Sequence, residues 1–326
     1  MAISLRVTIS GQKRRDRKII IHKPDIGETE TFSLDNLGYS HKRDYFKSVI
    51  RVCQRRGMSF TNGFECEIKS QIPFQAGTSS SSAIVVSWIN FLAQLVDTPP
   101  KWSKKTIGEL AYLAESIEFQ EPGGIMDQYT VACGGLLHIK SEPRIFLKTI
   151  EAQLGHFVLG DSCEPKETID ILENCKNLRL EILDKIKSHN PKFNLHEISY
   201  QNDLPYLDEQ EKNLLYATLK NRDLLEQGFK ELNKGEINHE YFGELLNQEH
   251  QILRDELNIS TKKIDSMLSA SIDAGAYGGK INGSGGGGCM FAYSPENPEA
   301  IVSAIESVGG KAYIIGKDEG TKILSK

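Results

Sequence analysis

Apolar residues alternate with polar ones in several segments of the first 75 residues. Residues 3–9 and 64–68 both show the two-residue period of a half-buried strand. A basic segment at 13–18 precedes an apolar run at 19–21, which predicts two strands joined by a charged turn. A basic run can also bind phosphate, but a solvated turn is the favoured interpretation.

The period becomes helical after Pro73. Small hydroxyl residues open a long apolar run at 79–96, a pattern typical of a helix start. A second helix is predicted over 106–119 and is ended by Pro122 and the two glycines after it. Apolar, strand-like segments follow at 136–139, 144–150 and 156–162.

Lysine, glutamate and leucine at helical spacing dominate residues 166–275, which predicts amphipathic helices. A glycine-rich stretch at 278–288 is followed by a strand, a helix at about 296–308 and a closing strand. A strand-rich first half and a helical second half with terminal strands indicate an α+β fold in two domains. We expect these domains to cover 1–155 and 156–326.

Composition narrows the class of protein. The chain has 326 residues, of which 39% are hydrophobic and 25% charged, enough to build two domains with cores. Its net charge of -5 gives no general attraction to a phosphate backbone, so we expect no nucleic-acid partner.

The six cysteines form no CxxC pair and are interpreted as reduced thiols of a cytoplasmic protein. No signal-peptide pattern or run of roughly 18 apolar residues is present, so no membrane partner is expected. Composition carries no prediction of the oligomeric state.

The segment PFQAGTSSSSA at 73–83 is the most informative one for chemistry. A loop of small residues lets backbone N–H groups approach an anion, and the following helix adds the positive end of its dipole. Serine hydroxyls can donate to phosphate oxygens or bind Mg²⁺. The segment is not a Walker A loop, and a well-capped buried helix is an equal alternative on these grounds alone. The candidate phosphate-binding residues are Ala76, Gly77, Thr78, Ser79, Ser80, Ser81 and Ser82.

Two further segments carry candidate chemistry. Asp127 follows a glycine pair and lies among apolar residues, an environment that suits a carboxylate accepting or orienting a hydroxyl proton. A lone aspartate in a turn is more often a cap. The stretch 278–288 holds seven glycines in eleven positions, and close approach of backbone to a phosphate explains that density better than a linker does, because apolar strands flank it. Its candidate binding residues are Gly283, Ser284, Gly285 and Gly286.

Together the three segments resemble the GHMP kinases, named for galactokinase, homoserine, mevalonate and phosphomevalonate kinases. PFQAGTSSSSA is similar to the family's phosphate-binding motif, KINGSGGGGC to its glycine-rich third motif, and GGIMDQY to the galactokinase-type sequence around the catalytic aspartate. Their order and spacing agree with the family over essentially the whole chain. The resemblance implies a two-domain α+β fold with ATP and the acceptor in the cleft between domains.

The resemblance also implies roles for individual residues. Asp127 corresponds to the aspartate that activates or orients the C1 hydroxyl of the sugar. The family's magnesium-binding glutamate lies twelve residues earlier, which is Glu115 here, with Glu118 as the fallback. The magnesium-ligating serine corresponds to Ser81. ATP and Mg²⁺ are therefore the expected cofactors.

Two departures from the family pattern stand out. Thr78 replaces the usual leucine. The first family motif, with its Pro-Gly-Arg and Gly-Glu-His segments, is absent, and Met1-Ala2-Ile3 resembles the strand entry that follows it, so we expect the sequence to begin just after that motif.

The main prediction is phosphorylation of a monosaccharide, galactose or a relative, at C1. The alternatives are a catalytically weak sugar- and nucleotide-binding protein and a mevalonate- or homoserine-type kinase.

Overall fold

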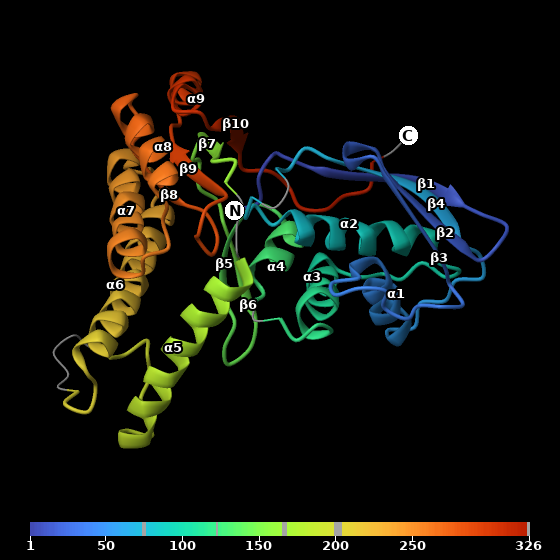
Figure 1. The fold of residues 1–326 in the computed structure, drawn as a ribbon, viewed down its shortest axis with the longest axis horizontal. Coiled ribbons are helices and arrows are strands. Elements are labelled where there is room, and N and C mark those ends of the chain that lie inside the picture. Colours follow the sequence, from blue (N-terminus) through green and yellow to red (C-terminus); the bar gives the residue numbers. More distant parts are fainter. Residues whose placement is uncertain (74–75, 122, 165–167, 199–203, 325–326) are drawn as a thin grey trace. The chain divides into compact units, whose positions relative to one another are not determined.

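The computed structural model describes residues 1–73, 76–121, 123–164, 168–198 and 204–324. Mostly antiparallel sheets and packed helices give an α+β fold, as predicted (Figure 1). The chain forms two compact units. The first comprises Met1–Phe74, Ser79–Ile150 and Lys317–Lys326, and the second comprises Gln75–Thr78 and Glu151–Gly316. The division expected after residue 155 places the last ten residues in the second domain, whereas they pack with the first unit.

A four-stranded sheet in the order β1-β4-β2-β3 forms one side of the first unit. Its strands are β1 (Val7–Lys13), β2 (Lys18–Lys23), β3 (Glu28–Ser33) and β4 (Phe64–Ser70). The alternation seen at 64–68 places Phe64, Cys66 and Ile68 on the buried face. A short helical turn, η1 (Pro24–Ile26), connects β2 to β3.

Helices pack on the buried face of this sheet and on one another. They are α1 (Tyr45–Arg55), α2 (Ser80–Leu95), α3 (Lys104–Tyr112), the π-helical turn η2 (Leu113–Ile117) and α4 (Met126–Cys133). Trp88 of α2 is fully buried at the centre of the core. Its ring lies 5.1 Å from the ring of Phe46 and 5.4 Å from that of Phe64, so α1, α2 and the sheet share one aromatic cluster. A two-stranded hairpin, β5 (Leu136–Lys140) with β6 (Phe146–Ile150), completes the unit.

The first strand differs from the sequence prediction. It begins at Val7 instead of Ile3, because its partner β4 ends at Ser70, which pairs with Val7. Ile3 instead makes an isolated bridge to Lys317 of the returning C-terminal segment. The helix predicted over 106–119 is not a single regular helix. The α-helix ends at Tyr112, and a π-helical turn continues it to Ile117.

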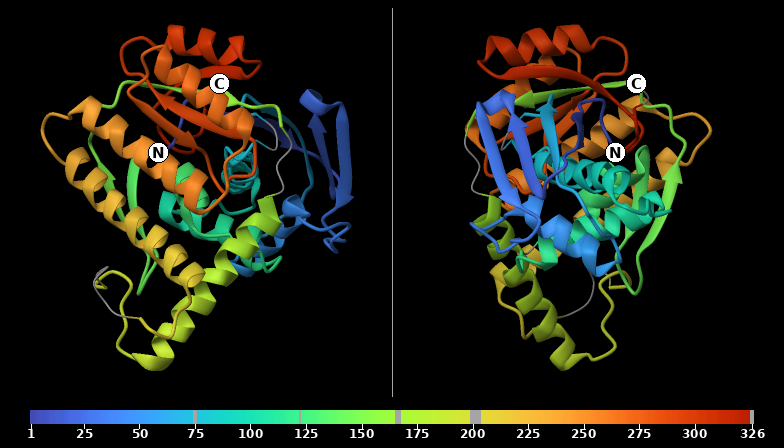
Figure 2. Two further views of the ribbon diagram at one scale, coloured as in Figure 1. Left: turned by 60° about the vertical axis from the view of Figure 1, so that its left-hand side comes forward. Right: turned by 90° about the vertical axis from the view of Figure 1, so that its right-hand side faces the viewer.

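The second unit contains a four-stranded antiparallel sheet in the order β10-β7-β9-β8. The strands are β7 (His156–Asp161), β8 (Gly278–Ile281), β9 (Cys289–Tyr293) and β10 (Lys311–Gly316). Its helices are α5 (Thr168–His189), α6 (Glu209–Leu232), α7 (His239–Gln251), the π-helical turn η3 (Ile252–Glu256), α8 (Lys262–Asp273) and α9 (Pro298–Ser307). The long helices α6 and α7 run side by side in both sets of views (Figures 1 and 2).

Two apolar clusters stabilise the second unit. One packs α8 and α9 on the sheet through residues such as Met267, Met290 and Ile305. The other joins α5 to α6 through Ile186 and Leu219. Within the described residues, no helix has the length and apolar character needed to cross a membrane.

Candidate active site

Glu115 is a buried carboxylate on the π-helical turn after α3. Its side chain is 6% exposed, and its neighbours Ala114 and Ser116 are also buried, whereas Ile117 is exposed. A π-helical turn carries one extra residue per hydrogen-bonded loop and so changes which residues face inward. The change takes effect after Glu115, because Gly108, Ala111 and Glu115 are buried at regular helical spacing whereas Ile117 is exposed.

Two polar side chains hold the Glu115 carboxylate. The Ser82 hydroxyl donates to Oε2 at 2.7 Å, and the Gln128 amide nitrogen donates to the same oxygen at 2.7 Å. Burial raises the pKa of Glu115, the hydroxyls of Ser81 and Ser82 and the amide of Gln128 oppose this, and the charge of Asp127 adds to it. Taking a carboxylate out of water without a cation is unfavourable, so this group is one that gains from a bound cation.

The first turn of α2 supplies the serines that approach this carboxylate. Ser79 precedes the helix in the left-handed region at φ 57°, and no side chain caps the helix N-terminus. The N–H groups of the first turn therefore lack a side-chain cap and point toward any anion placed at that end. Ser82 is buried at 2% exposure and faces Glu115, while Ser80 and Ser81 are half-buried. The role of Ser81 as a magnesium ligand stays a prediction.

Asp127 lies in the first turn of α4. It is half-buried, between exposed Met126 and buried Gln128. It is near enough to Glu115 for its charge to raise the pKa of that group. The structure therefore places the two predicted acidic residues near each other in the first unit, one buried and one half-buried.

Glu118, the fallback for the magnesium ligand, is engaged elsewhere. It accepts hydrogen bonds from the Tyr39 hydroxyl and the Arg55 guanidinium. Burial raises the pKa of Glu118, but the hydrogen bonds from Arg55 and Tyr39 outweigh it and hold the pKa below its ordinary value. A carboxylate already neutralised by an arginine is a weaker candidate for a metal ion than Glu115 is.

The loop Ala76–Thr78 belongs to the second unit and is fixed by the glycine-rich segment. The Cys289 N–H donates to the Ala76 carbonyl at 2.9 Å, and the Asn282 amide donates to the Gly77 carbonyl at 2.8 Å. Two of the three motifs, about 200 residues apart in sequence, thus meet in one unit. The carbonyl groups of Ala76 and Gly77 are therefore held by residues at the end of β8 and the start of β9.

The glycine-rich loop between β8 and β9 needs its glycines. Gly283 and the four glycines from 285 to 288 all have positive φ, a region that side chains disfavour. A Cβ on Gly285 would lie 2.4 Å from the Ile259 carbonyl oxygen, and the adjacent Gly286 N–H donates to that same oxygen at 2.7 Å. The Ser284 hydroxyl is buried and has no hydrogen-bond partner among the described residues. A ligand oxygen is one acceptor that could satisfy it.

A histidine holds the strand that leads into this loop. His250 is buried, and its Nε2 lies 3.1 Å from Asp265 Oδ1 while its Nδ1 accepts from the Ile281 N–H at 3.3 Å. Burial lowers the pKa of His250, and Asp265 opposes the shift. The neutral ring fits these contacts, because only an unprotonated Nδ1 can accept the backbone N–H.

An arginine near Glu115 was not predicted from the sequence. Arg43 adopts φ 65° just before α1 and binds Glu121, with 2.8 Å between Nη2 and Oε2. The hydrogen bond that Arg43 donates to Glu121 raises the pKa of Arg43, and the charge of Glu115 adds to the effect. Its only sequence signal is a run of basic residues at 41–43, which is common on any surface.

The donor set in the first unit fits Mg²⁺. This ion prefers hard oxygen ligands, usually one or two carboxylates with the remaining positions taken by water and phosphate. Glu115 and the serine hydroxyls of α2 are such ligands, and the buried Gln128 Oε1, which has no partner among the described residues, is a further acceptor. The residues present therefore suit the ion that the motifs predict.

Known proteins match the chain along both units. The GHMP kinases N terminal domain matches residues 44–135, and the GHMP kinases C terminal domain matches residues 227–311. A mevalonate kinase of Thermococcus onnurineus is 28% identical, covering 99% of this chain and 90% of the relative. A galactokinase of Mannheimia succiniciproducens is 26% identical, covering 90% of this chain and 78% of the relative.

Solved structures agree on the fold. A Lactococcus lactis galactokinase complexed with galactose superimposes with a TM-score of 0.85 at 22% identity, covering 99% of this chain and 88% of that one. The Methanococcus jannaschii mevalonate kinase gives a TM-score of 0.73 at 20% identity, covering 98% and 90%. The two domain matches, the full-length relatives and the two-unit α+β fold agree, and the chain belongs to the GHMP kinase superfamily.

Proposed function

We propose that this protein transfers the γ-phosphoryl group of ATP to a hydroxyl group of a small molecule. The observation that carries the proposal is the buried Glu115 carboxylate, held by Ser82 and Gln128 beside half-buried Asp127. Phosphoryl transfer depends mainly on positioning and on neutralising phosphate charge. A buried carboxylate that gains from a bound cation, next to a half-buried second carboxylate, is suited to that task.

Each group has a separate role in this proposal. Glu115 and Ser81 would hold Mg²⁺, which when bound neutralises phosphate charge. Asp127 orients the acceptor hydroxyl and takes its proton as transfer proceeds. Ser82 and Gln128 act through Glu115, because both of their hydrogen bonds end on its carboxylate.

Backbone groups would bind the phosphates. The uncapped N-terminus of α2 presents N–H groups with the favourable dipole. Gly77 and the five glycines of the glycine-rich loop have positive φ, a conformation that lets the backbone approach a phosphate closely. Ser284, whose buried hydroxyl has no partner among the described residues, is placed to contact a phosphate oxygen in this loop.

The acceptor we favour is a hydroxy acid of the mevalonate type. The mevalonate kinases of Thermococcus onnurineus and Thermococcus gammatolerans match 99% and 96% of this chain at 28% identity. A monosaccharide is the second candidate. It is supported by the GGIMDQY sequence at 123–129 and by the TM-score of 0.85 to a galactokinase. Homoserine stays a further alternative within the superfamily.

A panel of acceptors tests the proposal. ADP release is followed with Mg-ATP and mevalonate, homoserine, galactose and other monosaccharides, and ³¹P NMR identifies the phosphorylated hydroxyl. We expect mevalonate to be turned over with the highest kcat/KM. Sugar phosphorylation instead would select the second candidate. Tight Mg-ATP binding without turnover on any acceptor would favour a non-catalytic binding protein and refute the kinase proposal.

A further inference from the structure

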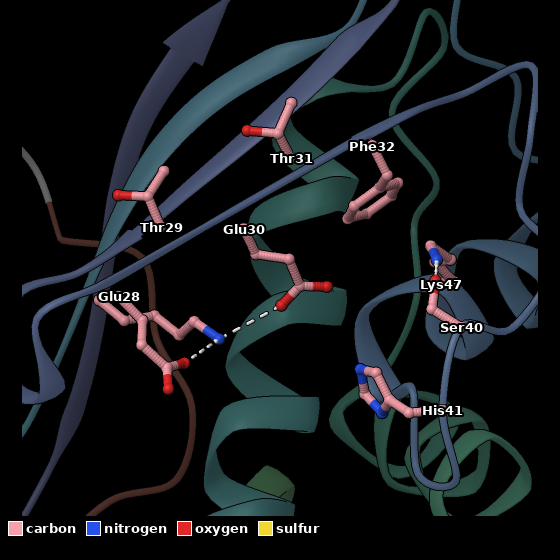
Figure 3. A pocket seen from close by; sticks show the side chains of 9 residues that line it. Glu28, Thr29, Glu30, Thr31, Phe32, Ser40, His41 and Lys47 are labelled. Atoms are coloured by element: carbon pink, nitrogen blue, oxygen red, sulfur yellow. Dashed lines mark hydrogen bonds and ion pairs between the residues drawn. The ribbon is translucent and has the colours of Figure 1, made fainter.

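A pocket of about 340 Å³ opens in the first unit between β3 and the loop that leads into α1. Figure 3 shows acidic Glu28 and Glu30 and basic Lys47 around it. The Lys23 ammonium lies 3.2 Å from Glu28 Oε2 and 3.2 Å from Glu30 Oε2. None of its lining residues belongs to the motifs described above. They are Lys23, Glu28, Thr29, Glu30, Thr31, Phe32, Ser40, His41 and Lys47.

Three metal-binding side chains converge beside this pocket. Glu30 comes from β3, His41 from the loop, and Asp44 from the residue before α1. One ligand atom of each lies within 4.8 Å of the ligand atoms of the other two. Such spacing allows one ion to contact all three after small side-chain adjustments.

Asp44 gives independent evidence for a missing partner. The residue is 1% exposed, and its Oδ1 has no hydrogen-bond partner among the described residues. The other oxygen, Oδ2, accepts the Ser40 N–H at 2.9 Å and lies 3.0 Å from the Lys47 ammonium. A buried carboxylate oxygen without a hydrogen-bond donor or a cation destabilises the folded state. A cation bound at Oδ1 would therefore be stabilising.

Neighbouring groups also contact the side chains of His41 and Glu30. His41 Nδ1 lies 3.0 Å from the Lys42 carbonyl. A proton on Nδ1 donates to that carbonyl and leaves the lone pair on Nε2 for a metal ion, the usual arrangement of a ligating histidine. The Lys23 ammonium lies 3.2 Å from Glu30 Oε2 and restricts the position of the Glu30 carboxylate.

We propose that Glu30, His41 and Asp44 bind one divalent transition-metal ion of the Zn²⁺ class. One imidazole nitrogen and two carboxylate oxygens are a typical ligand set for Zn²⁺, Co²⁺ or Ni²⁺, whereas Mg²⁺ and Ca²⁺ prefer oxygen alone. Water would fill the remaining positions, since the pocket is open to solvent. The positive ammonium groups of Lys23 and Lys47 repel a bound cation. We therefore expect reversible binding instead of a permanently filled site.

The ion would join β3 to the start of α1. It is separate from the Mg²⁺ proposed at Glu115, because no residue is shared. The proposal therefore stands or falls independently of the kinase assignment.

Cobalt titration tests the proposal, because Co²⁺ substitutes for Zn²⁺ and its visible absorption reports nitrogen and oxygen coordination. We expect one saturable Co²⁺ per chain, displaced by Zn²⁺ but not by excess Mg²⁺. His41→Ala should weaken binding by at least about tenfold, since even loss of an outer-shell partner commonly costs that much. His196→Ala removes an equally exposed histidine and should change nothing.

Thermal unfolding supplies a second readout. A ligand that binds only the folded chain raises Tm, so Zn²⁺ should raise the Tm of wild type and of His196→Ala. It should not raise the Tm of His41→Ala or of Glu30→Gln, which keeps the size of the side chain. Equal Co²⁺ affinity in wild type and His41→Ala, or equal Zn²⁺-dependent Tm shifts in all four proteins, would overturn the proposal. Absence of saturable Co²⁺ binding to wild type would overturn it as well.

Discussion

Replacing Glu115 by glutamine should separate the stability of the protein from its use of magnesium. The carboxylate is 6% exposed, and burial raises its pKa. Glutamine retains an oxygen that can accept from both Ser82 and Gln128, but it carries no charge to keep out of water. We therefore expect Glu115→Gln to unfold at the same or higher urea concentration, with a gain of up to about 2 kcal/mol, as is common when a functional site loses an unfavourable group.

Magnesium dependence should move in the opposite direction. Loss of a carboxylate ligand should raise the Mg²⁺ concentration needed for half-maximal ATP binding by at least about tenfold. Calorimetric titration of ATP at a series of fixed Mg²⁺ concentrations measures this directly. Affinity for ATP without Mg²⁺ should change little or even improve, because one negative charge has been removed from the site.

Glu118→Gln is the matched control on the same stretch of helix. Its ion pair with Arg55 and its bond to Tyr39 are partly exposed, so the variant should lose about 0.2–1 kcal/mol of stability. Its Mg²⁺ dependence should equal that of wild type. If Glu118→Gln needs more Mg²⁺ and Glu115→Gln does not, the assignment of the magnesium ligand is wrong.

Three further predictions concern separate parts of the chain. Asp127→Asn should bind Mg-ATP normally and lose about 10²–10⁴-fold in kcat on the accepted substrate; full turnover would remove Asp127 from the chemistry. Gly285→Ala should cost about 1–3 kcal/mol more than Gly275→Ala in urea unfolding, because both have positive φ but only Gly285 faces an oxygen 2.4 Å from the added carbon, and equal losses would contradict this. Since burial lowers the pKa of His250, the unfolded chain binds more protons there. The stability from the neutral ring is thus complete above the ordinary histidine pKa of about 6.5 and declines as pH falls below it. His250→Gln should show a weaker decline between pH 7.5 and 5.5, and an identical decline would refute the role.

Much of the fold follows from residue periodicity. The alternation at 64–68 and the helical pattern after residue 79 correspond to β4 and α2 as observed. The start of β1 could not be predicted, because it is set by where β4 ends and by the pairing of Ile3 with the returning segment near Lys317. Such a contact joins opposite ends of the chain and leaves no local pattern.

The candidate site was predictable in its residues but not in its environment. Family-like spacing pointed to both Glu115 and Asp127. The buried Glu115 carboxylate accepts from Ser82 of α2, a tertiary contact that periodicity does not reveal. The part of Gln128 in holding the carboxylate is likewise a tertiary contact. Arg43 was missed because a basic run before a helix is usually only solvated.

The hydrogen bonds that fix the Ala76–Thr78 loop have a consequence for the order in which the protein matures. Asn282 donates to Gly77 across 205 positions of sequence, and the Cys289 N–H completes the attachment at Ala76. At a synthesis rate of roughly 5–20 residues per second, the loop would wait about 10–40 s on the ribosome before its partners exist. During that interval a nascent chain can form α2 but cannot fix the loop that precedes it. A chain interrupted before residue 282 should therefore lack both bonds that hold residues 76–78, even when α2 has already formed.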